Sequence, residues 1–409
     1  MNTDYPSSRR GLLLCGLLFC ATALSFLDRQ VLSVLAPTLV AEFDMSNTSY
    51  SRVVTAFVAS YTVMFAVGGR VMDHLGTRIG LGLAVGLWSI ASAAHALATG
   101  PLGLGAARLL LGVGEGACFP GVTKGAIEWM PPHRRAFAVG LANGGSAFGA
   151  VLAPPLTAWW AATWGWRGAF VATALLGAGW LVAWVMATRG LPRAEAASVE
   201  ASPTRFRDLL ARPALRRMVI ARFFFDPVFY LYMFWIPQYL ATERGMSLAQ
   251  IGALTWIPFL AVGISTILAG RLSDLLVERG WQPRKARLGW MLIAALVTPV
   301  SWLVIVADGP GLAIALMSVL MFAHGFWIAN FITLITDIVD ARAVATAVGL
   351  TGMAGGIAGM LSNLATGPVV DAFGFAPVFL AASVVYPIAW LIIASHRPGS
   401  VAGANGGLS

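Results

Sequence analysis

Long apolar runs, each ended by glycine, proline or charged residues, follow one another along almost the whole chain. A transmembrane helix needs about 20 consecutive apolar residues, and most of these runs reach about that length. The twelve runs fall at about 11–38, 50–72, 79–98, 102–130, 136–162, 167–188, 216–243, 248–271, 287–307, 310–338, 343–370 and 376–395. This pattern predicts an all-α membrane protein with twelve transmembrane helices.

The composition supports this interpretation. Of the 409 residues, 58% are hydrophobic and 11% are charged, whereas a soluble domain carries about 25% charged residues. A soluble enzyme and a disordered chain are therefore both excluded. The three cysteines, Cys15, Cys20 and Cys118, all lie in apolar runs and lack the spacing of a metal site or a disulfide framework. We expect no bound metal.

The net charge of +9 reflects membrane orientation rather than a nucleic-acid partner. Of the 27 lysines and arginines, 20 fall in predicted loops or tails on the side of the N-terminus. The opposite side has Arg52, Arg167 and Arg244. Because cytoplasmic loops are enriched in these residues, we expect both termini in the cytoplasm. The first run lacks a small-residue cleavage site and is interrupted by charge, so we expect a retained helix rather than a signal peptide.

A polar stretch at 189–215 divides the runs into six and six. A short motif recurs in the two sets, 201 residues apart: Gly69-Arg-Val-Met-Asp73 and Gly270-Arg-Leu-Ser-Asp274. Such internal duplication is how many transporters build two halves around a central site. We expect a six-helix half at 1–188, a cytoplasmic linker at 189–215, a second half at 216–395 and a cytoplasmic tail at 396–409.

Several motifs resemble those of a known family. The stretch from Gly69 through Asp73, His74 and Gly76 to Arg78 resembles the loop motif of the major facilitator superfamily. Segments similar to its anion:cation symporter branch, and within it to bacterial hexuronate transporters, are Arg108–Pro120, Glu128–Pro131, Asp226–Leu240, Trp256–Phe259 and Gly349–Gly356. The resemblance spans roughly residues 20–395.

Charged residues inside the first run invite a functional hypothesis, since a charge at the bilayer centre costs at least ~2.5–3.5 kcal/mol. Asp28 and Arg29 are neighbours, so their side chains point about 100° apart on a helix and face different surroundings. The resemblance implies that Asp28 is a proton site and that Arg29 meets the substrate carboxylate. An internal ion pair that holds helices together is the alternative.

Arg108 and Glu115 lie seven residues apart in the fourth run, on one helix face and about 10 Å apart along the axis. This distance excludes a direct salt bridge between them, so each needs a partner on another helix, in the substrate or in water. We predict that Glu115 couples protons together with Asp28, and that Arg108 binds substrate. A structural Arg–Glu network is the alternative and is compatible with coupling.

A sugar-like ligand needs hydroxyl partners and a flat apolar face. The predicted substrate contacts are Tyr61, Ser146, Tyr230, Trp327 and Asn330. The resemblance implies Tyr61 as a ligand contact, whereas packing or an interfacial belt is the better explanation for any one of the other aromatic residues. Some relatives carry glutamine where Ser146 aligns, which places the detailed sugar contacts here in question.

The duplicated motif supplies the predicted gate. Asp73, Arg78 and Asp274 lie at cytoplasmic loop ends near other charges, and we expect them to lock the cytoplasmic side rather than touch substrate. Two further pairs at i,i+4 spacing are expected to be structural or gating: Lys124 with Glu128, and Arg222 with Asp226.

Together these features predict a monomeric, proton-coupled symporter in lipid of the bacterial inner membrane. Its expected substrate is a sugar acid, above all a hexuronate such as galacturonate or glucuronate, moved by alternating access. An aldonate such as galactonate, an aldarate or an aromatic acid stays open. A passive pore is disfavoured because a duplicated six-plus-six architecture with buried acids suits alternation. A membrane enzyme is disfavoured because no metal cluster, nucleophile–base pair or cofactor fingerprint occurs. No GxxxxGK[ST] sequence occurs, so we expect that ATP does not drive transport. The proton is the only cofactor expected, and His324 is the other mid-membrane group that titrates near neutral pH.

Overall fold

The computed structural model describes residues 8–191, 206–340 and 343–395, and nearly all of these are helical with no strand among them. The first half contains α1 (Ser8–Val34), α2 (Ala36–Glu42), α3 (Asn47–Leu75), α4 (Thr77–His95), α5 (Pro101–Gly116), α6 (Cys118–Trp129), η1 (Pro132–Arg134) and α7 (Arg135–Thr188). After α8 (Phe206–Ala211), the second half contains α9 (Pro213–Phe234), α10 (Ile236–Arg244), α11 (Leu248–Leu254), α12 (Trp256–Glu278), α13 (Pro283–Val297), α14 (Val300–Val306), α15 (Gly309–Ile338), α16 (Val344–Phe373) and α17 (Ala376–Ala394). The predicted all-α fold is confirmed.

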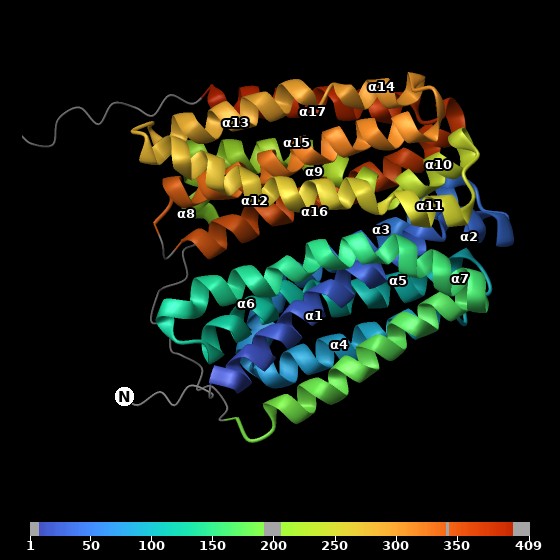
Figure 1. Cartoon of the computed structure of the whole chain (residues 1–409), viewed down its shortest axis with the longest axis horizontal. Coiled ribbons are helices and arrows are strands. Elements are labelled where there is room, and N and C mark those ends of the chain that lie inside the picture. The colour runs from blue at the N-terminus through green and yellow to red at the C-terminus, as the bar shows by residue number, and fades with distance from the viewer. Residues whose placement is uncertain (1–7, 192–205, 341–342, 396–409) are drawn as a thin grey trace, which may run out of the picture.

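The count of membrane spans depends on how bent helices are treated. Ten described stretches are long and apolar enough to cross a bilayer, and the bent pair α9 and α10, at 60°, makes an eleventh. Helix α7 has 54 residues and would be about 81 Å long if straight, far beyond the ~30 Å of a hydrocarbon core. Gly165, with φ 71° and ψ 172°, breaks it; glycine adopts this conformation freely. Helix α7 reverses direction along its length (Figure 1), in agreement with this break, so it supplies two spans and the eleven counted above become twelve among the described residues.

Several predicted spans are broken helices rather than continuous ones. The fourth, seventh, eighth and ninth runs correspond to the pairs α5–α6, α9–α10, α11–α12 and α13–α14. A proline follows each break within three residues, because its ring removes a backbone donor and clashes with the preceding turn. These prolines are Pro120, Pro237, Pro258 and Pro299. The first run ends in the same way, with a break at Leu35 before Pro37.

Large apolar side chains cover the outside of the molecule. Leu97, Leu102, Ile267 and Phe373 are all more than 70% exposed. A soluble protein rarely exposes so many large apolar side chains, whereas lipid solvates them at no cost. The surface thus agrees with the membrane location that the apolar runs predict.

The helices form two bundles, α1–α7 and α9–α17, lying side by side (Figure 1). Between them, α3 packs against α16, and α7 packs against α11 and α12. We call the end of the molecule at which α1 finishes the far end and the end at which α1 starts the near end. The linker predicted at 189–215 lies largely outside the described residues, and the tail predicted at 396–409 lies entirely outside them.

Backbone carbonyls join the two bundles toward the far end. Ser33 donates a hydrogen bond to the carbonyl oxygen of Met233 at 2.6 Å, and Tyr50 donates to that of Phe234 at 2.8 Å. Both carbonyls lie in the last turn of α9, just before the break at Trp235. The α9–α10 break therefore presents backbone acceptors to the other half.

Candidate functional site

A buried ion pair joins α1 and α5. The Nη2 and Nε atoms of Arg29 donate to Oε2 of Glu115 at 2.9 and 3.1 Å. Ser25, one turn before Arg29, donates to the same oxygen at 3.0 Å. Both charged side chains are buried. The partner that Glu115 requires on another helix is therefore Arg29.

Three aromatic rings surround the Arg29 guanidinium. Its carbon Cζ lies 4.5 Å from the ring centroid of Tyr61, 4.6 Å from that of Phe26 and 5.2 Å from that of Phe57. A cation over aromatic faces is held electrostatically, most strongly when water is excluded. The structure thus places Tyr61 directly beside Arg29. Phe26 and Phe57 were not among the predicted residues, although Phe26 precedes Arg29 by three and shares its helix face.

Asp28 faces a different part of the first half. Its Oδ1 accepts a hydrogen bond from the Ser92 hydroxyl of α4 at 2.7 Å, and Ser92 lies 2.7 Å from the Thr173 hydroxyl of α7. Asp28 is buried. The expectation that Asp28 and Arg29 face different surroundings is confirmed. Ser92 and Thr173 are not among the predicted site residues, because a single hydroxyl side chain within an apolar run does not indicate a functional site.

Arg108 lies behind the Arg29–Glu115 pair. Its Nη1 donates to the backbone oxygen of Arg29 at 3.2 Å, and its Cζ lies 5.7 Å from the Phe57 ring. Arg108 is 1% exposed. It therefore supports α1 at Arg29 from a position that no solvent reaches in this conformation.

We refer to Asp28, Arg29, Arg108 and Glu115 as the central cluster. Four of its polar atoms make no hydrogen bond within the described residues: Asp28 Oδ2, Glu115 Oε1, Arg108 Nε and Arg108 Nη2. A buried polar atom left unsatisfied costs about 1–3 kcal/mol, and more when charged. Carboxylate oxygens can take up protons, and guanidinium N–H groups bind carboxylates. The cluster is therefore chemically suited to take up protons and an organic anion.

Tyr230 and Ser146 occupy different surroundings. The Tyr230 ring of α9 stacks on Phe234 with centroids 6.1 Å apart, and Phe234 packs against Phe57 of α3 at 6.1 Å, so α9 reaches the aromatic rings around Arg29. Ser146 is half-buried in α7, and its hydroxyl donates to the backbone oxygen of Asn143 at 2.8 Å. Its role as a ligand contact stays a prediction.

Trp327 and Asn330 lie inside the second half. The Trp327 ring packs against Phe225 and Tyr386, with centroids 5.4 and 5.2 Å away, and its side chain is fully buried. Asn330 donates from Nδ2 to the backbone oxygen of Phe326 at 2.9 Å. The structure does not bring either residue to Arg29, and ligand contact by Trp327 would require this packing to change.

The second half has charged groups of its own. Arg222 Nε donates to Asp226 Oδ2 at 2.9 Å, as the i,i+4 spacing predicts, and Arg222 Nη1 donates to the Thr351 hydroxyl at 3.3 Å. Deeper in this half, His324 Nδ1 lies 2.5 Å from the Tyr386 hydroxyl. Each of these charged or titratable groups has a neighbouring partner within its own half.

The two motif aspartates pair within their own halves at the near end. Asp73 accepts a hydrogen bond from Lys124 Nζ at 2.7 Å, and Lys124 also lies 3.8 Å from Glu128. Arg78 is exposed. Among the described residues, neither Asp73 nor Asp274 pairs with a residue of the other half. Their gating role stays a prediction.

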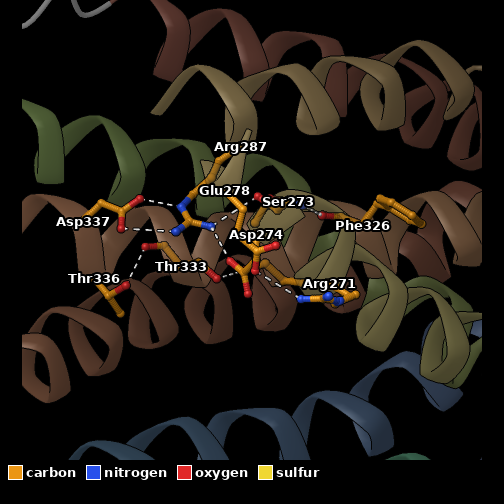
Figure 2. A network of polar contacts seen from close by, with 11 residues as sticks. Arg271, Ser273, Asp274, Glu278, Arg287, Phe326, Thr333, Thr336 and Asp337 are labelled. Atoms are coloured by element: carbon orange, nitrogen blue, oxygen red, sulfur yellow. Dashed lines mark hydrogen bonds and ion pairs between the residues drawn. The ribbon is translucent and has the colours of Figure 1, made fainter. Parts of the chain in front are cut away.

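Figure 2 shows the corresponding network of the second half. Arg287 of α13 donates to both carboxylate oxygens of Asp337 in α15, at 2.5 and 3.4 Å, and to Ser273 of α12 at 3.3 Å. Asp274 lies 4.0 Å from Arg287, and Arg271 donates to Glu278 at 3.3 Å. Arg287 therefore ties α12, α13 and α15 together.

A carboxylate joins the two halves at the far end. Asp371, near the end of α16, accepts hydrogen bonds from both backbone and side-chain groups at the start of α3. These come from Asn47 N and Nδ2 at 3.0 and 2.9 Å, and from Thr48 N and Oγ1 at 2.9 and 2.6 Å. A carboxylate suits this place because the first N–H groups of a helix lack intrahelical acceptors. Sequence analysis missed Asp371 because its partner helix is more than 320 residues away.

Known proteins resemble this chain in sequence and in fold. The model of the Major Facilitator Superfamily matches residues 18–363. A hexuronate transporter of Escherichia coli (strain K12) is 32% identical over 91% of this chain and 90% of its own length. A D-galactonate transporter of Escherichia coli O6:H1 is 26% identical over 94% of this chain and 95% of its own.

Solved structures agree on the fold. A D-xylose-proton symporter has a TM-score of 0.77 at 16% identity, covering 95% of this chain and 98% of that one. A bacterial homolog of the human lysosomal transporter Spinster, in an inward-facing and occupied conformation, has a TM-score of 0.75 at 19% identity, covering 95% and 96%. The twelve spans, the family match across most of the chain and the full-length relatives together show that this chain belongs to the major facilitator superfamily.

Proposed function

We propose that this chain is a proton-coupled symporter that imports a sugar acid, most specifically a hexuronate such as galacturonate or glucuronate. The observation that carries the proposal is the buried Arg29–Glu115 ion pair. In it, a carboxylate of the protein is paired with the cation that a substrate carboxylate would need. Relatives named as hexuronate and galacturonate transporters support the substrate class.

Competition for Arg29 links the proton to the substrate. While Glu115 is ionised, it holds Arg29 through two hydrogen bonds to one oxygen. When Glu115 takes up a proton, its negative charge disappears and Arg29 becomes available to the substrate carboxylate. A carboxylate leaving water needs such a cationic partner, because an unpaired buried charge is very unfavourable. Proton uptake therefore favours substrate binding, and by linkage the reverse holds equally.

Asp28 and Arg108 extend this coupling around the same point on α1. Asp28 has one oxygen hydrogen-bonded to Ser92, and the other has no hydrogen-bond partner among the described residues, which leaves a position for a second proton. Arg108 donates to the backbone oxygen of Arg29, and its Nε and Nη2 atoms have no hydrogen-bond partner in the described part of the chain. Movement of Arg29 toward a ligand would therefore change the surroundings of both Asp28 and Arg108.

The contacts between the halves fit alternating access. Ser33, Tyr50 and Asp371 join the halves toward the far end. The charged pairs at the near end stay within one half each. If both termini face the cytoplasm, as the charge distribution predicts, this conformation is closed to the outside of the cell. The protein would act as a monomer in the bacterial inner membrane.

Tyr61, Phe57 and Phe26 support a sugar-like ligand, since they give the Arg29 site flat apolar faces. The second candidate substrate is an aldonate, favoured by the relative named as a D-galactonate transporter.

The experiment is uptake into liposomes that contain the purified protein. We expect galacturonate to accumulate inside when the outside is made acidic, to saturate with concentration, and to carry protons with it. A pore would instead equilibrate galacturonate without accumulation. A thermal-shift screen of hexuronates, aldonates and aldarates identifies the acid that binds, and failure of all of them would reject the sugar-acid assignment.

A further inference from the structure

The charged pair of α9 faces the boundary between the halves. Arg222 and Asp226 are 17% and 12% exposed in their side chains, although they lie mid-helix in a membrane span. Gly352 of α16 lies between α9 of its own half and α3 of the other half. A Cβ built on it would lie 3.8 Å from Arg222 Nη1 of α9 and 3.3 Å from Phe65 Cε1 of α3. Arg222 therefore lies between the Phe331 ring of its own half, 5.9 Å from its Cζ, and the part of α16 that meets α3 of the other half.

A row of aromatic rings leads from this pair to the central cluster. Phe65 stacks on Tyr61 with centroids 5.9 Å apart, and Tyr61 lies against Arg29. The Tyr230 ring of α9 stacks on Phe234 with centroids 6.1 Å apart, and Phe234 packs against Phe57, whose ring also lies against Arg29. Residues 222, 226 and 230 are four apart, so they share one face of α9 with steps of about 6 Å. Asp226 and Arg222 thus lie about one and two turns from Tyr230 on the same face of α9.

Among the described residues, the pair has N–H donors and a carboxylate oxygen that make no hydrogen bond. Asp226 Oδ2 takes the hydrogen bond from Arg222 Nε, and Thr351 takes the one from Nη1. Within the described residues, Arg222 Nη2 and Asp226 Oδ1 have no hydrogen-bond partner. The glycine at 355 leaves room for this carboxylate, because a Cβ there would overlap it.

A donor beside an acceptor matches a hydroxyl group, which donates and accepts at once. It does not match a second carboxylate, which Asp226 would repel. We propose that Arg222 and Asp226, with Thr351 holding the guanidinium, recognise the hydroxyl-bearing end of the ligand whose carboxylate is held at Arg29. The proposal rests on the proposed function. It assigns recognition of the sugar hydroxyls to the second half and binding of the carboxylate to the first half.

The test compares ligands as well as variants. Binding of D-galacturonate and of its monodeoxy analogues is measured by calorimetry on the purified full chain, for wild type and for Asp226→Asn. A hydrogen bond to a charged group makes a difference of about 10-fold or more in affinity. We expect Asp226→Asn to bind D-galacturonate about 10-fold more weakly. We also expect at least one monodeoxy analogue to bind wild type about 10-fold more weakly than D-galacturonate does. That analogue should bind Asp226→Asn and wild type with the same affinity, because the hydroxyl that Asp226 would contact is already missing.

Two further variants guard against misfolding. Thr351→Val leaves the charged pair intact but removes the hydroxyl that orients Arg222, and it should give the same pattern to a smaller degree. Thr366→Val on the same helix is its control, because the Thr366 hydroxyl bonds only to the Ser362 carbonyl of its own helix. Arg222→Gln has a matched control in Arg216→Gln, an exposed arginine of α9.

The outcomes separate the two proposals. If wild type binds no sugar acid, both the proposed function and this inference fail. If wild type binds D-galacturonate and Asp226→Asn binds it within twofold of wild type, this inference alone fails. It also fails if removing each hydroxyl of the ligand lowers the binding affinity by the same factor in wild type and in Asp226→Asn. The charged pair would then affect binding only by stabilising the protein structure.

Discussion

The two halves share a duplicated architecture, but they hold their buried charges differently. In the first half, the central cluster brings two acids and two arginines together and leaves four of their polar atoms without a described partner. In the second half, Arg222 is paired with Asp226 four residues away, and His324 lies against Tyr386. The position 201 residues after Glu115 is Leu316, so the counterpart of the coupling acid is apolar.

This difference indicates a division of labour. Unsatisfied charges in a buried site respond strongly to a proton or an anion, because either one relieves an unfavourable state. A charged pair that is already matched responds weakly to charge and instead offers hydrogen bonds. The first half is thus suited to couple the proton to the carboxylate, and the second half to select among ligands of equal charge.

The largest effect is expected at Arg29. The double variant Arg29→Ala/Glu115→Gln should bind D-galacturonate at least about 100-fold more weakly than wild type. The reason is that the buried carboxylate of the substrate loses its cationic partner, and breaking such a pair costs about 3–5 kcal/mol. The double variant avoids leaving Glu115 ionised and unpaired, so folding is preserved. Calorimetry on the purified protein measures the effect, with Glu115→Gln alone as the control. Affinity close to wild type in the double variant would show that Arg29 does not bind the carboxylate.

Glu115→Gln separates binding from coupling, since glutamine imitates the protonated acid permanently. We expect substrate exchange across liposome membranes to stay within about twofold of wild type. Accumulation driven by a pH gradient should fall at least about 10-fold, because proton and substrate binding no longer depend on each other. Paired counterflow and gradient assays measure the two. Loss of both activities together would indicate a structural role.

Asp28→Asn tests whether the first half contains a second coupling acid. We expect the same uncoupling as at Glu115, with somewhat weaker binding because Arg29 is the next residue. The assays are again counterflow and gradient-driven uptake. Full accumulation by Asp28→Asn, by Glu115→Gln and by the double variant would remove both carboxylates from the mechanism, and His324 of the second half would be examined next.

Asp371→Ala tests the joint between the halves. Loss of its hydrogen bonds to Asn47 and Thr48 should open the far end several-fold more often, with ligand affinity changed little. Accessibility of a single cysteine placed near the far end measures the opening. Asp308→Ala is the matched control, because Asp308 begins α15 without a side-chain cap bond. Equal labelling of both variants would contradict the role of Asp371.

The smallest effect is expected at the two motif aspartates. Asp73 and Asp274 are 72% and 61% exposed in their side chains, and exposed pairs contribute about 0–1 kcal/mol. Neutralising either one should shift accessibility toward the present conformation by no more than about fivefold, with D-galacturonate affinity unchanged. Labelling from each side of the membrane measures the shift. A collapse of affinity would place these residues in the binding site.

Much of the candidate site was predictable because an ionisable residue in an apolar run is rare and costly. Asp28, Arg29, Arg108 and Glu115 stand out in the sequence on that ground alone. The helical step also predicts that Asp28 and Arg29 face different surroundings, which the contacts to Ser92 and Glu115 confirm. The broken spans were less predictable, since apolar runs continue through prolines that bend the helix.

The sequence by itself determined the helical fold, the number of spans and the charged residues inside them, because the bilayer imposes a fixed length and a high cost on charge. Only the tertiary structure decided the partners: Arg29 with Glu115, Asp371 with the start of α3, and Trp327 with the interior of its own half. The physical reason is distance along the chain. Helical periodicity specifies which side chains share a face within about two turns, whereas contacts between helices depend on packing angles that no local pattern encodes.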